Sequence, residues 1–175
     1  LDFGFARYAE NVLTKPQITT WRTGRVKAVG SKTAPELYAA HLSQREAAQI
    51  LSNFFYDVRL KSRIELRAAD SMPPRYIAAY AQLVKSVFGS PAALQNVLRH
   101  YAGITTLDIT TAKLAVCKDG FNALAYGKPI SSELTWLLMQ ARSRTPSQEE
   151  RALLDPFMAL VMKRKTIRET ESYNE

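Results

Sequence analysis

The segment Asp57–Asp70, "DVRLKSRIELRAAD", alternates apolar and charged side chains almost without exception. On a β-strand, successive side chains point to opposite faces of the sheet. One face of a strand over residues 58–68 would carry Val58, Leu60, Ser62, Ile64, Leu66 and Ala68, and the other would carry Arg59, Lys61, Arg63, Glu65 and Arg67. The alternation therefore predicts one strand, with an apolar side for a core and a side that presents four cations around one carboxylate.

The charged side of this strand has two interpretations. A solvated sheet surface of mixed charge is the simpler one, although like charges two residues apart on one face repel each other mildly. The alternative is a ligand site, because arginine and lysine bind the oxygens of polyphosphate. A carboxylate among them suits Mg²⁺, which takes one or two carboxylates together with substrate phosphate oxygens. The residues alone therefore predict an anion site or a nucleotide–metal site, with a solvated surface as the alternative.

The composition indicates a folded, basic protein. Hydrophobic residues make up 46% of the chain, and 24 Lys and Arg against 16 Asp and Glu give a formal net charge of +8. This charge leaves open a non-catalytic module that binds nucleic acid or another anionic partner, although the absence of zinc-finger, RGG and RNP-like patterns disfavours nucleic acid. The single cysteine, Cys117, cannot form an internal disulfide, so we expect a cytoplasmic protein. No apolar run approaches the ~20 residues of a membrane-spanning helix, so we expect no membrane partner.

The remaining pattern is mainly helical. Apolar spacing predicts helices near residues 5–12 and twice within 35–55, and strand pieces with turns within 17–30. After the break at "DSMPP" the predicted helical segments are 75–88, 90–103, 107–120, 131–144 and 147–165, with Pro156 kinking or dividing the last. The predicted fold class is α+β, with a small antiparallel sheet portion and a helical C-terminal region. We expect one domain over residues 1–175, in which 1–73 contribute to the sheet and 74–175 are helical.

Helix caps support this division. Ser43 with Glu46, and Ser147 with Glu150, have the spacing of a capping box. Ser90 is the expected N-cap of the segment 90–103, and Asp108 is the expected N-cap of the following helix. The helix that begins at Ser43 is expected to bury Ala47, Ile50, Leu51 and Phe54.

Four segments resemble one enzyme family. "FFYDVRLKSRIELRAADSMP" (54–73) resembles the signature "FPDVRLKxYIExRxxDxxP" of glutamate–cysteine ligases. "DGFNALAYGKPISSEL" (119–134) and "SQEERALLDPFMALVMKRKT" (147–166) are similar to the family's C-terminal runs "GLNAxxYGKxxxEL" and "EExxLDPLxxLxxxGKT". "FARYAENVLTKP" (5–16) is similar to the segment that precedes the signature.

The resemblance implies an ATP- and Mg²⁺-dependent ligase with a glutamine-synthetase-like fold. In that chemistry the γ-carboxylate of glutamate becomes an acyl phosphate, which the amine of cysteine attacks. The resemblance makes Glu65 a metal ligand and Arg67 a catalytic residue that contacts the transferring phosphate. It assigns Arg59 and Lys61 to phosphate or to the substrate carboxylate.

Two departures from the family pattern limit what this chain is expected to do. Family members are about twice as long, and their N-terminal half carries further acidic metal ligands in patterns such as "GxExE", which this sequence lacks. We therefore expect a C-terminal piece of a longer ligase that is inactive without its N-terminal half. Arg63 and Ala68 replace an aromatic residue and a Gly or Ser of the pattern, so the acceptor amine stays open between cysteine and another amine.

The other reactive residues have ordinary explanations. His41 and His100 have no acid or cysteine at ligand spacing, so each is expected to be a satisfied or exposed histidine. Cys117 follows Leu114, Ala115 and Val116 and is expected in the core. Trp136 is expected to be a packing residue. Asp70 either orients Arg67 or is simply a turn acid.

Overall fold

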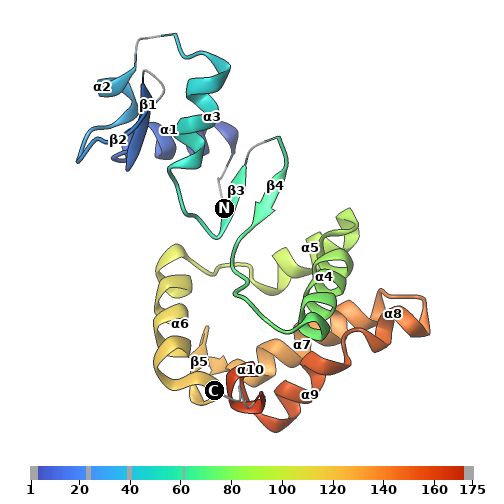
Figure 1. The fold of residues 1–175 in the computed structure, drawn as a ribbon. Helices are drawn as coiled ribbons and strands as arrows, with labels where there is room; N and C mark the ends of the chain where they lie inside the picture. The colour runs from blue at the N-terminus through green and yellow to red at the C-terminus, as the bar shows by residue number, and fades with distance from the viewer. Residues whose placement is uncertain (1–3, 23–24, 39–40, 61, 172–175) are drawn as a thin grey trace. The chain divides into compact units, whose positions relative to one another are not determined.

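The computed structural model describes residues 4–22, 25–38, 41–60 and 62–171. The chain divides into two compact units, Leu1–Ser71 and Met72–Glu175, and the boundary lies in the "DSMPP" segment. Helices dominate, and the described residues contain three antiparallel sheets of two strands each (Figure 1). The α+β character predicted from the sequence is therefore confirmed.

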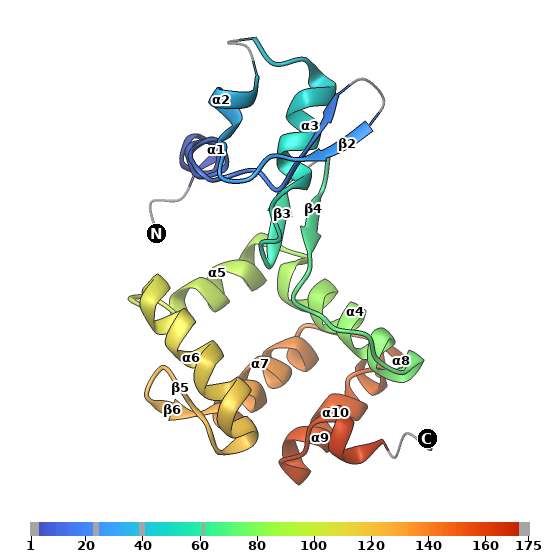
Figure 2. The ribbon, with the colours of Figure 1, turned by 60° about the vertical axis from the view of Figure 1, so that its left-hand side comes forward.

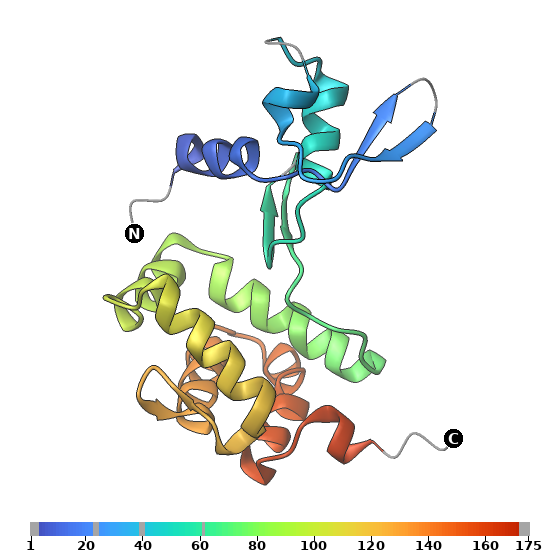
Figure 3. The same ribbon diagram turned by 90° about the vertical axis from the view of Figure 1, so that its left-hand side faces the viewer.

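The first unit combines short helices with two hairpins. Its elements are α1 (Phe5–Thr14), β1 (Thr19–Arg22), β2 (Arg25–Ala28), α2 (Ala34–Leu37), α3 (Gln44–Ser52), β3 (Val58–Leu60) and β4 (Ile64–Leu66). The predicted capping box begins α3, since the Ser43 hydroxyl accepts from the Glu46 backbone N–H and the Glu46 carboxylate accepts from the Ser43 backbone N–H at 2.9 Å. In Figure 3 the β1–β2 hairpin extends away from the helices of this unit.

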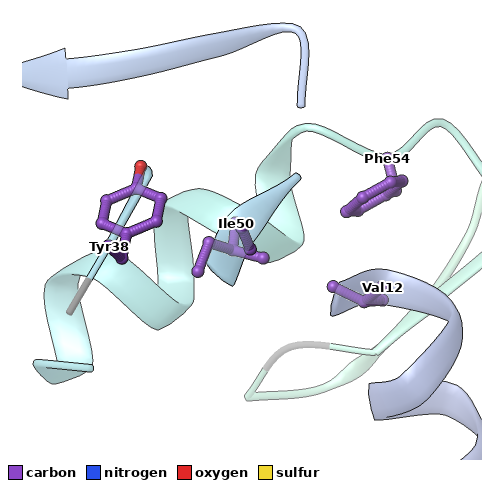
Figure 4. Close-up of a cluster of buried hydrophobic side chains, with 5 residues drawn as sticks. Val12, Tyr38, Ile50 and Phe54 are labelled. Atoms are coloured by element: carbon purple, nitrogen blue, oxygen red, sulfur yellow. The ribbon is translucent and has the colours of Figure 1, made fainter. Parts of the chain in front are cut away.

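The core of the first unit lies between α1, α2 and α3. Figure 4 shows four of its buried side chains, namely Val12, Tyr38, Ile50 and Phe54. Ile50 and Phe54 are buried as predicted, whereas Ala47 and Leu51 are only half-buried. The Tyr38 hydroxyl lies 2.9 Å from the Thr20 hydroxyl, which joins this core to β1.

The segment predicted as one strand over 58–68 is a hairpin, so that prediction is wrong. The chain reverses between Leu60 and Ile64, and the antiparallel register pairs Val58 with Leu66, Arg59 with Glu65, and Leu60 with Ile64. Residues directly opposite each other share a face of the sheet. Because each pair joins two odd or two even positions, the charged residues of the two strands still share one face and the apolar residues share the other.

The two faces are not buried as predicted. On the expected core side, Val58 and Ile64 are 51% and 69% exposed, and Leu60 and Leu66 are only half-buried. The side chains of Arg59, Arg67 and Glu65 are only 12%, 25% and 38% exposed. These three charged side chains are therefore partly buried, because Arg59 contacts the end of α3 and Arg67 contacts the segment that follows it.

The second unit is helical except for one short hairpin. It contains α4 (Pro74–Phe88), α5 (Pro91–His100), α6 (Thr106–Asp119), the 3₁₀-helix η1 (Gly120–Asn122), β5 (Leu124–Ala125), β6 (Lys128–Pro129), α7 (Ile130–Ser143), α8 (Gln148–Ala152), α9 (Asp155–Lys163) and α10 (Ile167–Thr170). α7 lies in the middle of the unit and packs against α4 and α9 (Figure 2). Its buried core comprises Val87, Leu138, Ala141, Leu154 and Val161.

Most helix boundaries of this unit follow local side-chain chemistry. The Ser90 hydroxyl accepts from the Ala93 backbone N–H at 3.2 Å, as predicted. Pro156 lies in the first turn of α9, which is a helix separate from α8. The N-cap prediction at Asp108 is wrong: Thr105 caps α6, and the Asp108 carboxylate accepts from the Thr105 backbone N–H at 2.8 Å, completing a capping box.

Within the described residues, no helix combines the length and the apolar character that crossing a membrane requires.

Asn53 supplies a test of how the first unit is held together. Its buried side chain accepts from the Thr19 backbone N–H at 2.8 Å and donates to the Thr19 carbonyl at 3.0 Å, which ties the end of α3 to β1. Asn53→Ala should lower the free energy of unfolding by about 1–3 kcal/mol, because it leaves partly buried backbone groups of Thr19 without their partner. Urea denaturation measures this change.

Ser52→Ala is the matched control, because the exposed Ser52 hydroxyl donates to the Ala48 carbonyl one turn earlier in α3. It should change the free energy of unfolding by less than about 0.5 kcal/mol. Equal effects of the two substitutions would show that Asn53 does not join α3 to β1.

Candidate functional site

The centre of the charged face is an ion pair between the two strands of the β3–β4 hairpin. Arg59 Nε donates to Glu65 Oε2 at 2.9 Å, and Arg59 Nη2 donates to Glu65 Oε1 at 3.1 Å. Such a two-pronged arginine–carboxylate contact fixes orientation as well as distance. Arg59 Nη1 also lies 3.4 Å from the Ser52 carbonyl at the end of α3. The Glu65 carboxylate is therefore held in place by an arginine that is itself anchored to a helix.

Arg67 stands beside this ion pair. Its backbone N–H donates to the Asp57 carbonyl at 2.7 Å, which extends the contact between the two arms of the hairpin. Its Nε atom lies 3.9 Å from Glu65 Oε1, and its guanidinium carbon lies 4.9 Å from the centre of the Phe55 ring. Its Nη1 atom is buried and has no hydrogen-bond partner among the described residues. Two guanidinium groups therefore flank one carboxylate, and one of them keeps an unused donor.

The other charged residues of the motif lie elsewhere or are not described. Arg63 is exposed in the segment that joins the strands, and Lys61 lies outside the described residues. The exposed Asp70 carboxylate accepts from the Ser71 backbone N–H at 2.7 Å, which favours its interpretation as a turn acid. Of the predicted site residues, the structure brings together Arg59, Glu65 and Arg67.

The residues present fit an anion better than a metal ion. Mg²⁺ needs several oxygen ligands, but both oxygens of the Glu65 carboxylate accept hydrogen bonds from Arg59, and the other acid of the hairpin, Asp57, lies opposite Arg67. No group of three or more His, Cys, Asp or Glu side chains that could hold a metal exists in the described part of the chain. Both oxygens of Glu65 are engaged by Arg59, whereas Arg67 Nη1 keeps an unused donor, which favours a negatively charged ligand.

A second cluster of ionisable groups lies in the second unit, around the buried Glu133 in the first turn of α7. His100 Nε2 lies 2.9 Å from Glu133 Oε2, and Lys128 Nζ lies 3.4 Å from Glu133 Oε1. The His100 ring stacks on Trp136 with their centres 3.5 Å apart, which confirms the packing role predicted for Trp136. Sequence spacing did not identify Glu133 as the partner of His100, because 33 residues separate them and only the packing of α5 against α7 brings them together.

The backbone helps to build this second cluster. Tyr126 and Gly127 join β5 to β6 with φ angles of 56° and 77°. Two-residue hairpin turns of this kind require positive φ at both positions, and tyrosine rarely adopts this conformation. The turn places Lys128 beside Glu133. Burial raises the pKa of Tyr101, and the neighbouring Glu133 carboxylate raises it further. The cluster thus joins α5, the hairpin and α7 through one carboxylate.

Cys117, predicted in the core, is exposed on α6. The apolar run "LAV" before it does not indicate burial, because Leu114 and Val116 are exposed as well.

No protein-family model matches the chain, and no curated protein matches it significantly. The ligase activity implied by the motif resemblance therefore stays a prediction.

Glu133 makes the stability of the second unit depend on pH. Burial acts to raise the pKa of Glu133, but hydrogen bonds from His100 and Lys128 outweigh burial and hold the pKa below the ordinary 4.5. A carboxyl whose pKa is lower in the fold stabilises the fold fully above 4.5, and this contribution is lost as the pH falls through the lower value. Glu133→Gln should therefore lower the free energy of unfolding by about 1–3 kcal/mol at pH 7. The difference in this free energy between the variant and wild type should shrink below pH 4.5.

Chemical denaturation of both proteins from pH 7 to pH 3, followed by circular dichroism, measures this difference. Glu149→Gln is the control, because Glu149 is exposed on α8. Its free energy of unfolding should stay within about 0.5 kcal/mol of the wild-type value. A Glu133→Gln difference that is constant across this range would show that the ionised form of Glu133 is not what stabilises the unit.

Proposed function

We propose that this chain is the C-terminal part of an ATP-dependent glutamate–cysteine ligase, which joins the γ-carboxylate of glutamate to the amine of cysteine through an acyl phosphate. The observation that carries the proposal is the partly buried face on which Arg59, Glu65 and Arg67 meet, inside the segment that resembles the ligase signature. The β3–β4 hairpin would be one portion of a glutamine-synthetase-like sheet.

The arginines suit the phosphoryl-transfer step. As the phosphoryl group passes from ATP to the glutamate carboxylate, negative charge is spread over its oxygens, and fixed positive groups stabilise this charge. Arg67 is the proposed catalytic residue, because it keeps an unused donor beside the Arg59–Glu65 ion pair. Arg59, and Lys61 outside the described residues, would bind phosphate or the substrate carboxylate.

Mg²⁺ would accompany ATP in this reaction and offset phosphate charge. Glu65 is the metal ligand that the resemblance implies, but its carboxylate is engaged by Arg59, so the metal would depend mainly on carboxylates outside this chain.

The proposed missing partner is an N-terminal half of the same protein. The β3–β4 sheet has two strands among the described residues, so each strand is paired along one edge. On its apolar face Val58 and Ile64 are exposed, and Leu60 and Leu66 are half-buried. Open edges and a partly uncovered apolar face suit further strands that complete a sheet. The activity would then belong to the whole protein, in the cytoplasm, and the 175 residues alone would be inactive.

A non-catalytic module that binds nucleic acid or another anion is the second candidate. Residues 11–35 contain five Lys and Arg and no Asp or Glu. Within them Arg25 and Lys27 are exposed on β2, and the exposed Trp21 on β1 could stack on a base. Binding of this kind weakens steeply with salt, so a gel shift at low salt that detects no complex would exclude the nucleic-acid form of this candidate.

The ligase proposal predicts a specific effect of Arg67→Lys. In the complete protein, with its N-terminal region, this substitution should lower kcat for ATP-dependent formation of γ-glutamylcysteine at least about tenfold, because a lysine point charge does not replace a planar guanidinium group. A coupled assay of ADP release with glutamate and cysteine measures the rate.

Arg63→Lys is the control for charge on the same segment, since Arg63 is exposed, and it should keep the rate within about twofold. If the rate of Arg67→Lys stays within about threefold of the wild-type rate, Arg67 does not take part in the reaction. A complete protein without ATP-dependent ligation of any amine to glutamate would contradict the proposed function itself.

A further inference from the structure

We propose that Glu65 positions two arginines for a phosphate-bearing ligand and does not hold a metal ion. The Arg59–Glu65–Arg67 face would bind phosphoryl oxygens directly, through guanidinium groups alone. This inference rests on the proposed function in that it specifies how the same site holds a phosphoryl group, and it departs from the metal role that the motif resemblance implies for Glu65.

The hydrogen bonds of Glu65 are the first observation against a metal ion. Both carboxylate oxygens accept from one edge of the Arg59 guanidinium group, at 2.9 and 3.1 Å. Arg59 is the most buried of the three side chains and reaches the Ser52 carbonyl with its remaining nitrogen. A metal ion at Glu65 would have to displace this two-pronged contact or lie between two guanidinium groups that repel it.

The unused donor of Arg67 is the second observation, and it favours an anion. A buried guanidinium N–H without a partner is unfavourable unless a ligand or water satisfies it. Arg67 Nη1 is such a group, while Phe55 supports the guanidinium plane and Glu65 lies 3.9 Å from Nε. A phosphoryl oxygen that reaches Nη1 would satisfy this donor, whereas a cation would not.

Charge explains why Glu65 is needed for anion binding. Without a carboxylate between them, Arg59 and Arg67 would repel each other and move apart. Glu65 lets two cations lie close together while Arg67 Nη1 keeps a donor for an anion. If Glu65 acted only through its negative charge, Glu65→Gln would make the face more attractive to an anion and would tighten binding. If Glu65 positions the two arginines, Glu65→Gln weakens binding.

Titration of pyrophosphate into the 175-residue chain at low salt, by calorimetry with EDTA and then with Mg²⁺, tests the proposal. We expect binding in EDTA, weakened at least about fivefold by Glu65→Gln and abolished by Arg67→Gln. Arg63→Gln, which removes an exposed cation from the same hairpin, should change the affinity less than about twofold. In wild type, the Arg59 and Arg67 side-chain Nε–H signals in ¹⁵N NMR spectra should shift on titration, and these shifts should be lost in Glu65→Gln while the backbone spectrum shows an intact fold.

Three results would overturn the proposal. Tighter binding by Glu65→Gln would show that Glu65 only lowers the local positive charge. Pyrophosphate binding that requires Mg²⁺ in wild type and loses this requirement in Glu65→Gln would make Glu65 a metal ligand. Absence of binding, with both arginine signals unmoved, would remove the anion site. The titration contains neither glutamate nor cysteine, so a complete protein that fails the ligase assay would contradict the proposed function and leave this result standing.

Discussion

The ion pair between Arg59 and Glu65 fixes the register of the β3–β4 hairpin and, with it, the whole candidate site. Each strand has three residues, and an isolated hairpin of this length is marginal in water. Burial of the apolar pairs sets the register only weakly, because each pair joins a half-buried leucine to an exposed residue, Val58 or Ile64. A slip of one residue would break the contact between the guanidinium and carboxylate groups. The polar face therefore holds this hairpin in register, in contrast to the usual sheet, in which the apolar face does so.

The helices of the first unit anchor the hairpin on both sides. The Leu60 backbone N–H donates to the Tyr8 hydroxyl of α1 at 3.2 Å, and Arg59 contacts the last residue of α3. Tyr8 in turn meets the edge of Tyr56, which stacks on the buried Phe54. The site thus depends on the core between α1 and α3, although none of its charged residues belongs to a helix.

The features that sequence reasoning predicted correctly are the local ones. The Ser43–Glu46 capping box and the start of α5 at Ser90 depend on groups within three residues of each other, so their chemistry is visible in a short window. The meeting of charged residues on one face was also predictable, because the alternation of the chain survives the reversal between Leu60 and Ile64. The reversal itself was not, since "KSR" contains only one residue type common in turns, Ser62, and no Gly, Asn or Pro. Burial of the charged face and the contact of His100 with Glu133 are set by distant elements, which periodicity does not encode.

The exposure of Cys117 has a practical consequence for work on this protein. It is the one cysteine in the 175-residue sequence, and its thiol is accessible on α6 of the second unit. A maleimide fluorophore or a nitroxide would therefore attach at a single known position without mutagenesis. The same thiol would couple two molecules through a disulfide in aerated buffer, so purified samples need a reductant until the label is in place.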